Sequence, residues 1–132
     1  MITFVDTSAF LALLDADEAS HPAVRGAWVD LLETRAPLLT TNYVLVETHA
    51  LVQRRLGLRA LRCWVEDLLP VVRVLWVSEE EHHAAVRALL AMGRRAVSLV
   101  DCVSFEAMRS RGVRRAFTLD RHFREQGFLC VP

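Results

Sequence analysis

The stretch ITFVDTSAFLALLD, residues 2–15, contains the change of pattern that predicts the fold of this chain. Residues 2–5 form a short apolar run that is typical of a buried strand. The run ends at the carboxylate of Asp6, and a second apolar run follows after two hydroxyl residues. The second hydroxyl, Ser8, is a suitable N-cap for a helix over residues 8–15. A carboxylate therefore stands where a buried strand leads into a helix.

Strands and helices alternate along the rest of the sequence. Hydrophobic spacing, capping residues and Gly or Pro breakers predict further helices over residues 21–33, 42–57, 58–70, 79–92, 98–112 and 121–127. The apolar segments between them predict buried strands over residues 36–41, 71–77, 114–120 and 128–132. This alternation is typical of parallel strands joined by helical crossovers, so we expect an α/β fold with a mostly parallel central sheet. At 132 residues, the chain fits one domain.

Composition narrows the class of protein but does not name a ligand. Sixteen basic residues balance sixteen acidic ones, so net charge gives no indication of a nucleic-acid partner. The three cysteines are odd in number, far apart and each in apolar company, which favours reduced, buried thiols in the cytoplasm over a disulfide framework. No apolar run approaches the roughly 20 residues that a membrane span needs. We therefore expect a cytoplasmic protein without a membrane partner.

Four acidic residues stand in apolar surroundings that are unusual for a charge. Each directly follows an apolar run, and the four are Asp6, Glu47, Asp101 and Asp120. A buried carboxylate is costly without a partner, so each of them needs one. Asp6 and Asp120 end predicted strands, and open parallel sheets bind ligands beyond the carboxyl ends of their strands. The sequence therefore predicts that these two acids share a site.

Each acid also has a simpler interpretation, and the sequence leaves both open. Asp6 and Asp120 can cap the helices that follow them. Asp101 stands three positions after Ser98, which is the spacing of a capping box. Glu47 can pair with an arginine from another element.

One hypothesis explains the four acids together. Converging carboxylates repel one another unless a divalent cation lies between them. Mg²⁺ prefers oxygen ligands and is commonly held by a few carboxylates together with substrate phosphates. Such a site suits metal-assisted hydrolysis of a phosphodiester. The histidines do not have the spacing of a ligand set, so we expect His49 and His122 to be ordinary polar or partly buried residues. Contact with substrate stays open as an alternative for His122, because it stands close to Asp120 in the sequence.

A series of blocks along the chain resembles the PIN-domain ribonucleases, and within them the VapC-like toxins of bacterial toxin–antitoxin pairs. The blocks are FVDTSAFLALLD, TTNYVLVETHALVQRRLG and SLVDCVSFEAMRSRGVRRAFTLDRHFREQGF, with a T-x-D-x-x-F motif at residues 118–123. The resemblance covers nearly the full length. It implies a single PIN domain over residues 1–132 with a three-layer α/β/α sandwich around a central, mostly parallel sheet.

The resemblance also implies an activity and partners. The implied activity is that of an endoribonuclease that depends on Mg²⁺ or Mn²⁺ and acts as the toxin of its pair. The family further implies a homodimer, an RNA substrate and a small antitoxin protein that blocks the acidic cleft. The implied metal-binding and catalytic residues are Asp6, Glu47, Asp101 and Asp120.

Four further residues near these acids have candidate roles. Ser8 and Thr118 are hydroxyls placed to orient a carboxylate or a water, although an N-cap and an ordinary strand residue are equally good interpretations. Arg121 and Arg124 follow Asp120 directly and are candidates for contacts with RNA phosphates. A solvated basic face is the simpler interpretation of the two arginines.

Two other functions compete with a nuclease. A catalytically silent PIN-like module that binds RNA or protein would be favoured by the loss of a metal-binding acid, and all four are present. A phosphatase with Asp6 as its nucleophile usually has a second acid two positions later, where this chain has Ser8. We therefore rank the phosphatase last.

Overall fold

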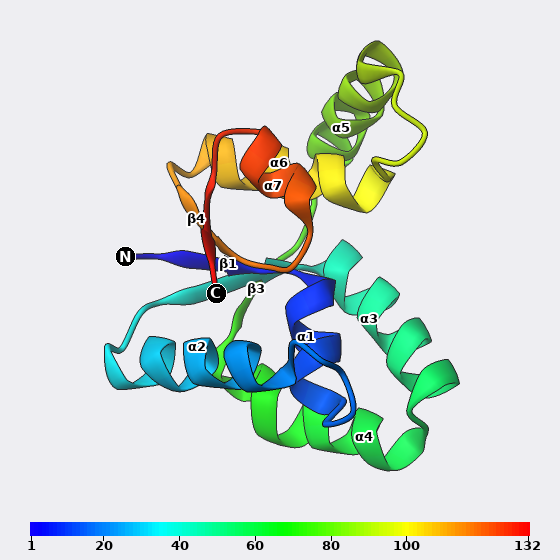
Figure 1. Ribbon diagram of the computed structural model, residues 1–132. Helices are drawn as coiled ribbons and strands as arrows, with labels where there is room; N and C mark the ends of the chain where they lie inside the picture. The colour runs from blue at the N-terminus through cyan, green and yellow to red at the C-terminus, as the bar shows by residue number, and fades with distance from the viewer.

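Five short strands form one fully parallel sheet in the computed structural model, which describes all 132 residues. The strands are β1 Thr3–Val5, β2 Leu38–Thr41, β3 Arg73–Leu75, β4 Arg115–Phe117 and β5 Leu129–Val131. Their order across the sheet is β3-β2-β1-β4-β5, so β1 is central (Figure 1). The parallel α/β architecture predicted from the sequence is therefore confirmed.

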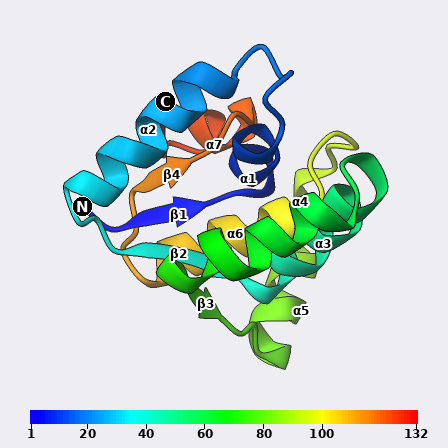
Figure 2. The same cartoon turned by 90° about the horizontal axis from the view of Figure 1, so that it is seen from below.

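Helices cover both faces of this sheet. They are α1 Thr7–Leu14, α2 His21–Glu33, α3 Asn42–Arg55, α4 Leu58–Cys63, α5 Glu79–Met92, α6 Leu99–Ser110 and α7 Arg121–Glu125. Figure 1 shows α1, α2 and α4 on one face and α6 and α7 on the other. Helix α3 contacts α1, α4 and α6, and α5 packs on α6, as the view in Figure 2 also shows. None of these helices combines the length and apolar character that a membrane crossing requires.

The core fixes β1 and the short helix α7 with aromatic side chains. All three residues of β1 are buried, and the Phe4 ring stacks on that of Phe123 with centroids 6.3 Å apart. Phe123 also meets the ring of Phe105 edge-on at 5.0 Å. Because Phe123 is fully buried, it holds the five-residue helix α7 against α6 and the sheet.

The strand order reverses between β1 and β4, and this reversal positions the functional site. From β1 the chain adds strands on one side, and from β4 it adds a strand on the other. The two strands are joined where they end, because the N–H of Asp6 donates to the carbonyl of Phe117 at 3.0 Å. Asp6 and Thr118 are thus the first residues beyond these strands, at the kind of switch point where open parallel sheets bind ligands.

Three local predictions were wrong. Helix α1 begins at Thr7 and has Asp6 as its N-cap, because the Asp6 carboxylate accepts from the Ser8 N–H. The helix predicted over residues 58–70 ends at Cys63 and continues as a π-helical turn, Trp64–Leu68, and a 3-10 turn, Leu69–Val71. Pro70 lies in the 3-10 turn and cannot donate the hydrogen bond that an α-helix needs there.

The third error concerns the strand predicted over residues 71–77. Only residues 73–75 form β3, and this strand lies at the sheet edge with β2 as its one neighbour. It is therefore only partly buried, and the side chain of Trp76 beyond it is 73% exposed. Hydrophobic composition alone does not distinguish an edge strand from a central one. The three cysteines are free thiols, but the prediction that all are buried was wrong, because Cys63 is exposed and Cys130 is half-buried.

Candidate active site

Asp6 is buried at the N-cap of α1, with one carboxylate oxygen held by the protein. Its residue exposure is 5%, and Oδ2 accepts hydrogen bonds from Ser8 Oγ at 2.8 Å and from Thr118 Oγ1 at 3.0 Å. The Ser8 N–H adds a longer bond of 3.4 Å to the same oxygen. No protein group donates to Oδ1, so that oxygen remains free for a ligand.

The hydroxyls of Ser8 and Thr118 join the ends of the two central strands. While each donates to Asp6, Ser8 Oγ accepts from the Leu119 N–H at 2.9 Å, and Thr118 Oγ1 accepts from the Asp120 N–H at 2.9 Å. The two hydroxyl oxygens lie 3.1 Å apart. Both residues thus orient a carboxylate, and Ser8 does so instead of capping the helix.

Asp101 and Asp120 repeat the pattern of one held and one free oxygen. In the capping box of α6, Asp101 Oδ2 accepts from the Ser98 N–H at 2.9 Å. At the N-cap of α7, Asp120 Oδ1 accepts from the His122 N–H at 2.9 Å. Asp101 Oδ1 and Asp120 Oδ2 accept no hydrogen bond from the protein. The capping roles considered from the sequence are therefore real, and each leaves an oxygen available for another role.

Glu47 approaches from α3 and is half-buried. It lines a shallow hollow of about 330 Å³ together with Asn42, Tyr43, Val46 and Val100, the residue before Asp101. No arginine or histidine lies within ion-pair distance of Glu47. The arginine partner considered from the sequence is absent.

The charges of the four acids act on one another. Burial raises the pKa of Asp6 from 3.8 to about 6; the Ser8 and Thr118 hydrogen bonds oppose this, and the charges of Asp101 and Asp120 add to it. Burial also raises the pKa of Glu47, and the charges of Asp101 and Asp120 contribute. The pKa of Asp101 is raised by burial and by Asp120, despite its bonds to Ser98. Acids from four separate segments therefore share one electrostatic environment.

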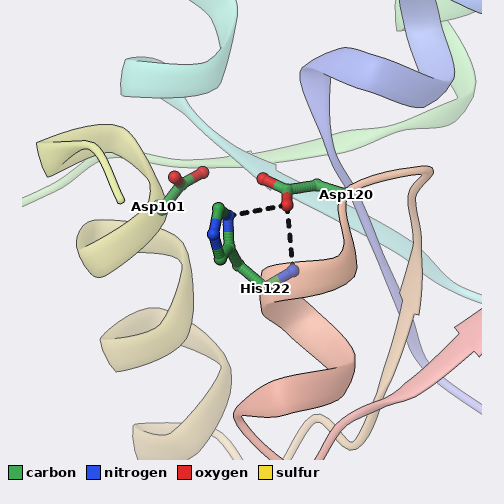
Figure 3. A group of neighbouring side chains, drawn as sticks. All are labelled: Asp101, Asp120 and His122. Carbon is green, nitrogen blue, oxygen red and sulfur yellow. Dashed lines mark hydrogen bonds and ion pairs between the residues drawn. The ribbon is translucent and has the colours of Figure 1, made fainter. Parts of the chain in front are cut away.

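His122 lies beside these acids, where the sequence favours an ordinary polar or partly buried residue and leaves contact with substrate as the alternative. The ring is 8% exposed and lies between the carboxylates of Asp101 and Asp120 (Figure 3). One ligand atom from each of the three residues lies within 4.8 Å of the others. The sequence contains a signal for this position, because the second residue of a helix lies close to its N-cap side chain, here Asp120.

These residues fit a divalent cation. Asp101 and Asp120 lie close together with His122, and Asp6, Glu47 and Asp101 have no Arg or His at ion-pair distance. Burial is the main cause of the raised pKa values of these three acids, and the neighbouring carboxylates raise them further. Neither ring nitrogen of the buried His122 makes a hydrogen bond, although Nδ1 lies at ion-pair distance, 2.8 Å, from Asp120 Oδ1. A bound cation would remove the repulsion and use these unpartnered atoms.

Arg121 and Arg124 are exposed on α7, next to the acids. Arg121 Nε lies 3.7 Å from Glu125, which also binds Arg94 of the loop before α6 at 2.9 Å. This ion pair joins the segments that carry Asp101 and Asp120. Both arginines belong to the helix that has Asp120 as its N-cap.

Comparisons with known proteins agree with this architecture. Residues 3–129 match the PIN domain family. The chain is 36% identical over 130 residues to the 23S rRNA-specific endonuclease VapC20 of Mycobacterium tuberculosis, covering 97% of this chain and 96% of that protein.

Solved structures of several proteins have a similar fold. The crystal structure of that VapC20, described as a sarcin–ricin loop cleaving toxin, has a TM-score of 0.83 over 96% of both chains. The fold also resembles VapBC2 from Rickettsia felis bound to a promoter DNA fragment, with a TM-score of 0.71, 12% identity and coverage of 98% and 97%. FitAcB from Neisseria gonorrhoeae has a TM-score of 0.71 and 15% identity, and covers 100% of this chain and 97% of its own.

Proposed function

This chain belongs to the PIN domain family, and we propose that it is an endoribonuclease and the toxin of a toxin–antitoxin pair. The observation that carries the proposal is the group of Asp101, Asp120 and His122 near the switch point of the sheet, whose acids also act electrostatically on Asp6 and Glu47. The relationship to a ribosomal RNA endonuclease over 97% of the chain supports it.

The residues that would hold the cofactor, Mg²⁺ or Mn²⁺, are Asp6, Glu47, Asp101 and Asp120. Each of the three aspartates has one oxygen held by a hydrogen bond and one free. When bound, the cation supplies Lewis acidity and positive charge beside the scissile phosphate. The protein's own contribution is orientation, because held oxygens fix the direction in which the free ones point.

Ser8 and Thr118 act on Asp6 and not on the substrate. Their hydroxyls both donate to Oδ2, which holds the carboxylate in one rotamer. Hydrolysis by water breaks the bond between phosphorus and the 3′ oxygen, so we expect products with a 5′-phosphate and a 3′-hydroxyl. Attack by the RNA's own 2′-hydroxyl would leave a 2′,3′-cyclic phosphate instead.

The substrate that we propose is the sarcin–ricin loop of 23S rRNA, by relationship to VapC20. Arg121 and Arg124 contact the RNA phosphates at the rim of the site, where exposed guanidinium groups can bind them. The partners that we propose are a small antitoxin protein and a second copy of this chain, as the family implies.

Cleavage of RNA tests the proposal. Asp6→Asn keeps the shape and the capping acceptor while it removes a charge, and Asp30→Asn on α2 is a matched exposed control. With rRNA, tRNA and a sarcin–ricin oligonucleotide, we expect wild type and Asp30→Asn to cleave in Mg²⁺ or Mn²⁺. EDTA and Asp6→Asn should abolish cleavage.

The alternative is a PIN-like module that binds RNA or protein without turnover. It would be favoured if wild type free of antitoxin cleaved none of these RNAs in either metal ion. Equal cleavage by wild type and Asp6→Asn would contradict the role of Asp6.

A further inference from the structure

The imidazole of His122 is a buried polar group that the protein itself does not satisfy. Nδ1 lies 2.8 Å from Asp120 Oδ1, but the contact does not have hydrogen-bond geometry, and Nε2 has no partner either. Buried polar atoms in native proteins nearly always have partners, so an unpartnered one requires an explanation. The ring position between two acids, visible in Figure 3, suggests that the missing partner is a ligand.

The core determines where this ring lies. The next residue, Phe123, is fully buried against Phe4 and Phe105 and anchors α7. The backbone N–H of His122 is also used, because it donates to Asp120 Oδ1 at 2.9 Å. With the backbone fixed on both sides, the imidazole faces α6, where Asp101 lies in the first turn of the helix. The ring is therefore held in place before any ligand binds.

The spacing of the donor atoms suits one cation. One ligand atom each of Asp101, Asp120 and His122 lies within 4.8 Å of the others. Nδ1 lies at ion-pair distance, 2.8 Å, from Asp120 Oδ1, the oxygen that also accepts the His122 N–H. Asp120 Oδ2 and Nε2 of the ring are thereby left for a cation. Asp6, whose Oδ2 is held by two hydroxyls, is not part of this group of three.

We propose that a ring nitrogen of His122 is the third ligand beside Asp101 and Asp120, and that it gives the site a preference for transition-metal ions over Mg²⁺. The inference rests on the proposed function, because it concerns the cation of the same site. Mg²⁺ selects oxygen donors, whereas imidazole suits ions later in the first transition series. An imidazole added to the carboxylate ligands therefore favours Mn²⁺ weakly and Co²⁺ or Zn²⁺ more strongly than an all-oxygen site would.

Metal binding to the metal-free protein tests this without measuring cleavage. Calorimetric titration with Mg²⁺ and with Co²⁺ would compare wild type, His122→Gln and the exposed control His83→Gln. We expect Co²⁺ to bind wild type and the control at least about tenfold more tightly than Mg²⁺. In His122→Gln, we expect a loss of about tenfold or more for Co²⁺ and less than about threefold for Mg²⁺.

Two results of this titration would contradict the inference. If Co²⁺ and Mg²⁺ affinities fall by the same factor in a folded His122→Gln, the histidine only positions Asp120, and the inference is wrong. Unchanged Co²⁺ affinity would also overturn it. Those two outcomes overturn the inference and leave the proposed nuclease untouched, whereas no binding of either ion to wild type would overturn both.

Wild type alone provides a second test that no folding defect can affect. Pulsed electron paramagnetic resonance of the Mn²⁺-loaded protein detects coupling to a ligated ¹⁴N nucleus. We expect this coupling in wild type and in His83→Gln. Mn²⁺ bound without nitrogen coupling would rule out His122 as a ligand and leave the carboxylate site intact.

Discussion

Thr118 donates its hydroxyl to Asp6 Oδ2 at 3.0 Å, although 112 positions separate the two residues. The same hydroxyl accepts the N–H of Asp120 at 2.9 Å. One side chain thus fixes the carboxylate after β1 and the turn after β4. These two hydrogen bonds explain how Asp6 and Asp120, which are far apart in the sequence, are held in a fixed arrangement beyond the carboxyl ends of β1 and β4.

Replacing this hydroxyl should weaken both the fold and the site. Thr118→Val keeps the shape but leaves buried partners without their hydrogen bonds, so we expect a loss of about 1–3 kcal/mol in the free energy of unfolding. Because Asp6 loses an orienting donor, we expect Mg²⁺ affinity to fall about 10–100-fold. Urea unfolding and calorimetry measure the two effects. Thr34→Val at the exposed end of α2 is the control, and equal behaviour of both variants would contradict the prediction.

The raised pKa of Asp6 predicts how the metal-free protein responds to pH. Its pKa is 3.8 in the unfolded chain and about 6 in the folded one. Between these values the folded state holds a proton that the unfolded state has lost, so stability falls as pH rises from below 4 to above 6. The difference corresponds to about 3 kcal/mol.

Asp6→Asn removes this cost, because the amide remains uncharged. In EDTA at pH 7.5, we expect the variant to be more stable than wild type, and the difference to vanish below pH 4. Urea unfolding from pH 4 to 8 measures the free energy of unfolding of both proteins. The difference between the two values at each pH cancels the contributions of the other titrating groups. If Asp6→Asn were less stable than wild type at pH 7.5, the predicted cost of burying a charged Asp6 would be contradicted. The exposed control Asp30→Asn should have the same stability as wild type across this pH range.

Asp101→Asn separates the two functions of one carboxylate. The amide oxygen can still accept the Ser98 N–H, so the cap of α6 should survive and metal-free stability should not fall. The free oxygen loses its charge, so stabilisation by a divalent cation should shrink. Wild type should gain about 2.7 kcal/mol at a Mg²⁺ concentration of 100 Kd, and the variant much less at the same concentration. Thermal unfolding with and without Mg²⁺ tests this; equal gains would exclude Asp101 as a ligand.

The sequence predicted the parallel sheet because alternating strands and helices have few other arrangements. It could not decide whether Asp6, Asp101 and Asp120 were helix caps or metal ligands, because the two oxygens of one carboxylate can serve the two roles separately. In the structure, one oxygen of each aspartate caps a helix and the other is free. The sequence around each aspartate is enough to predict the capping oxygen. The surroundings of the free oxygen depend on residues far away in the sequence, so only the tertiary structure reveals them.

His122 and Trp76 show why the rest was missed. The surroundings of His122 depend on Asp101, about twenty positions earlier, and on the packing of α6 against α7. Neither is visible in hydrophobic spacing. Trp76 lies in an apolar run typical of a buried strand, but β3 is the edge of the sheet. The position of a strand in the sheet depends on how the helical crossovers connect the strands, so the composition of the strand does not predict it.

Neutralising Arg121 and Arg124 together should weaken RNA binding more than the chemical step. Both side chains are exposed on α7, outside the group of acids, so the double variant to Gln should fold normally and keep its Mg²⁺ affinity. We expect KM for RNA to rise with little change in kcat, because phosphate contacts contribute alike to the bound substrate and the transition state. The slope of log(kcat/KM) against log[salt] should become shallower by about 0.7 per lost contact. Arg25→Gln on α2 is the matched control. An unchanged salt slope would show that these arginines are a solvated surface and do not contact the substrate.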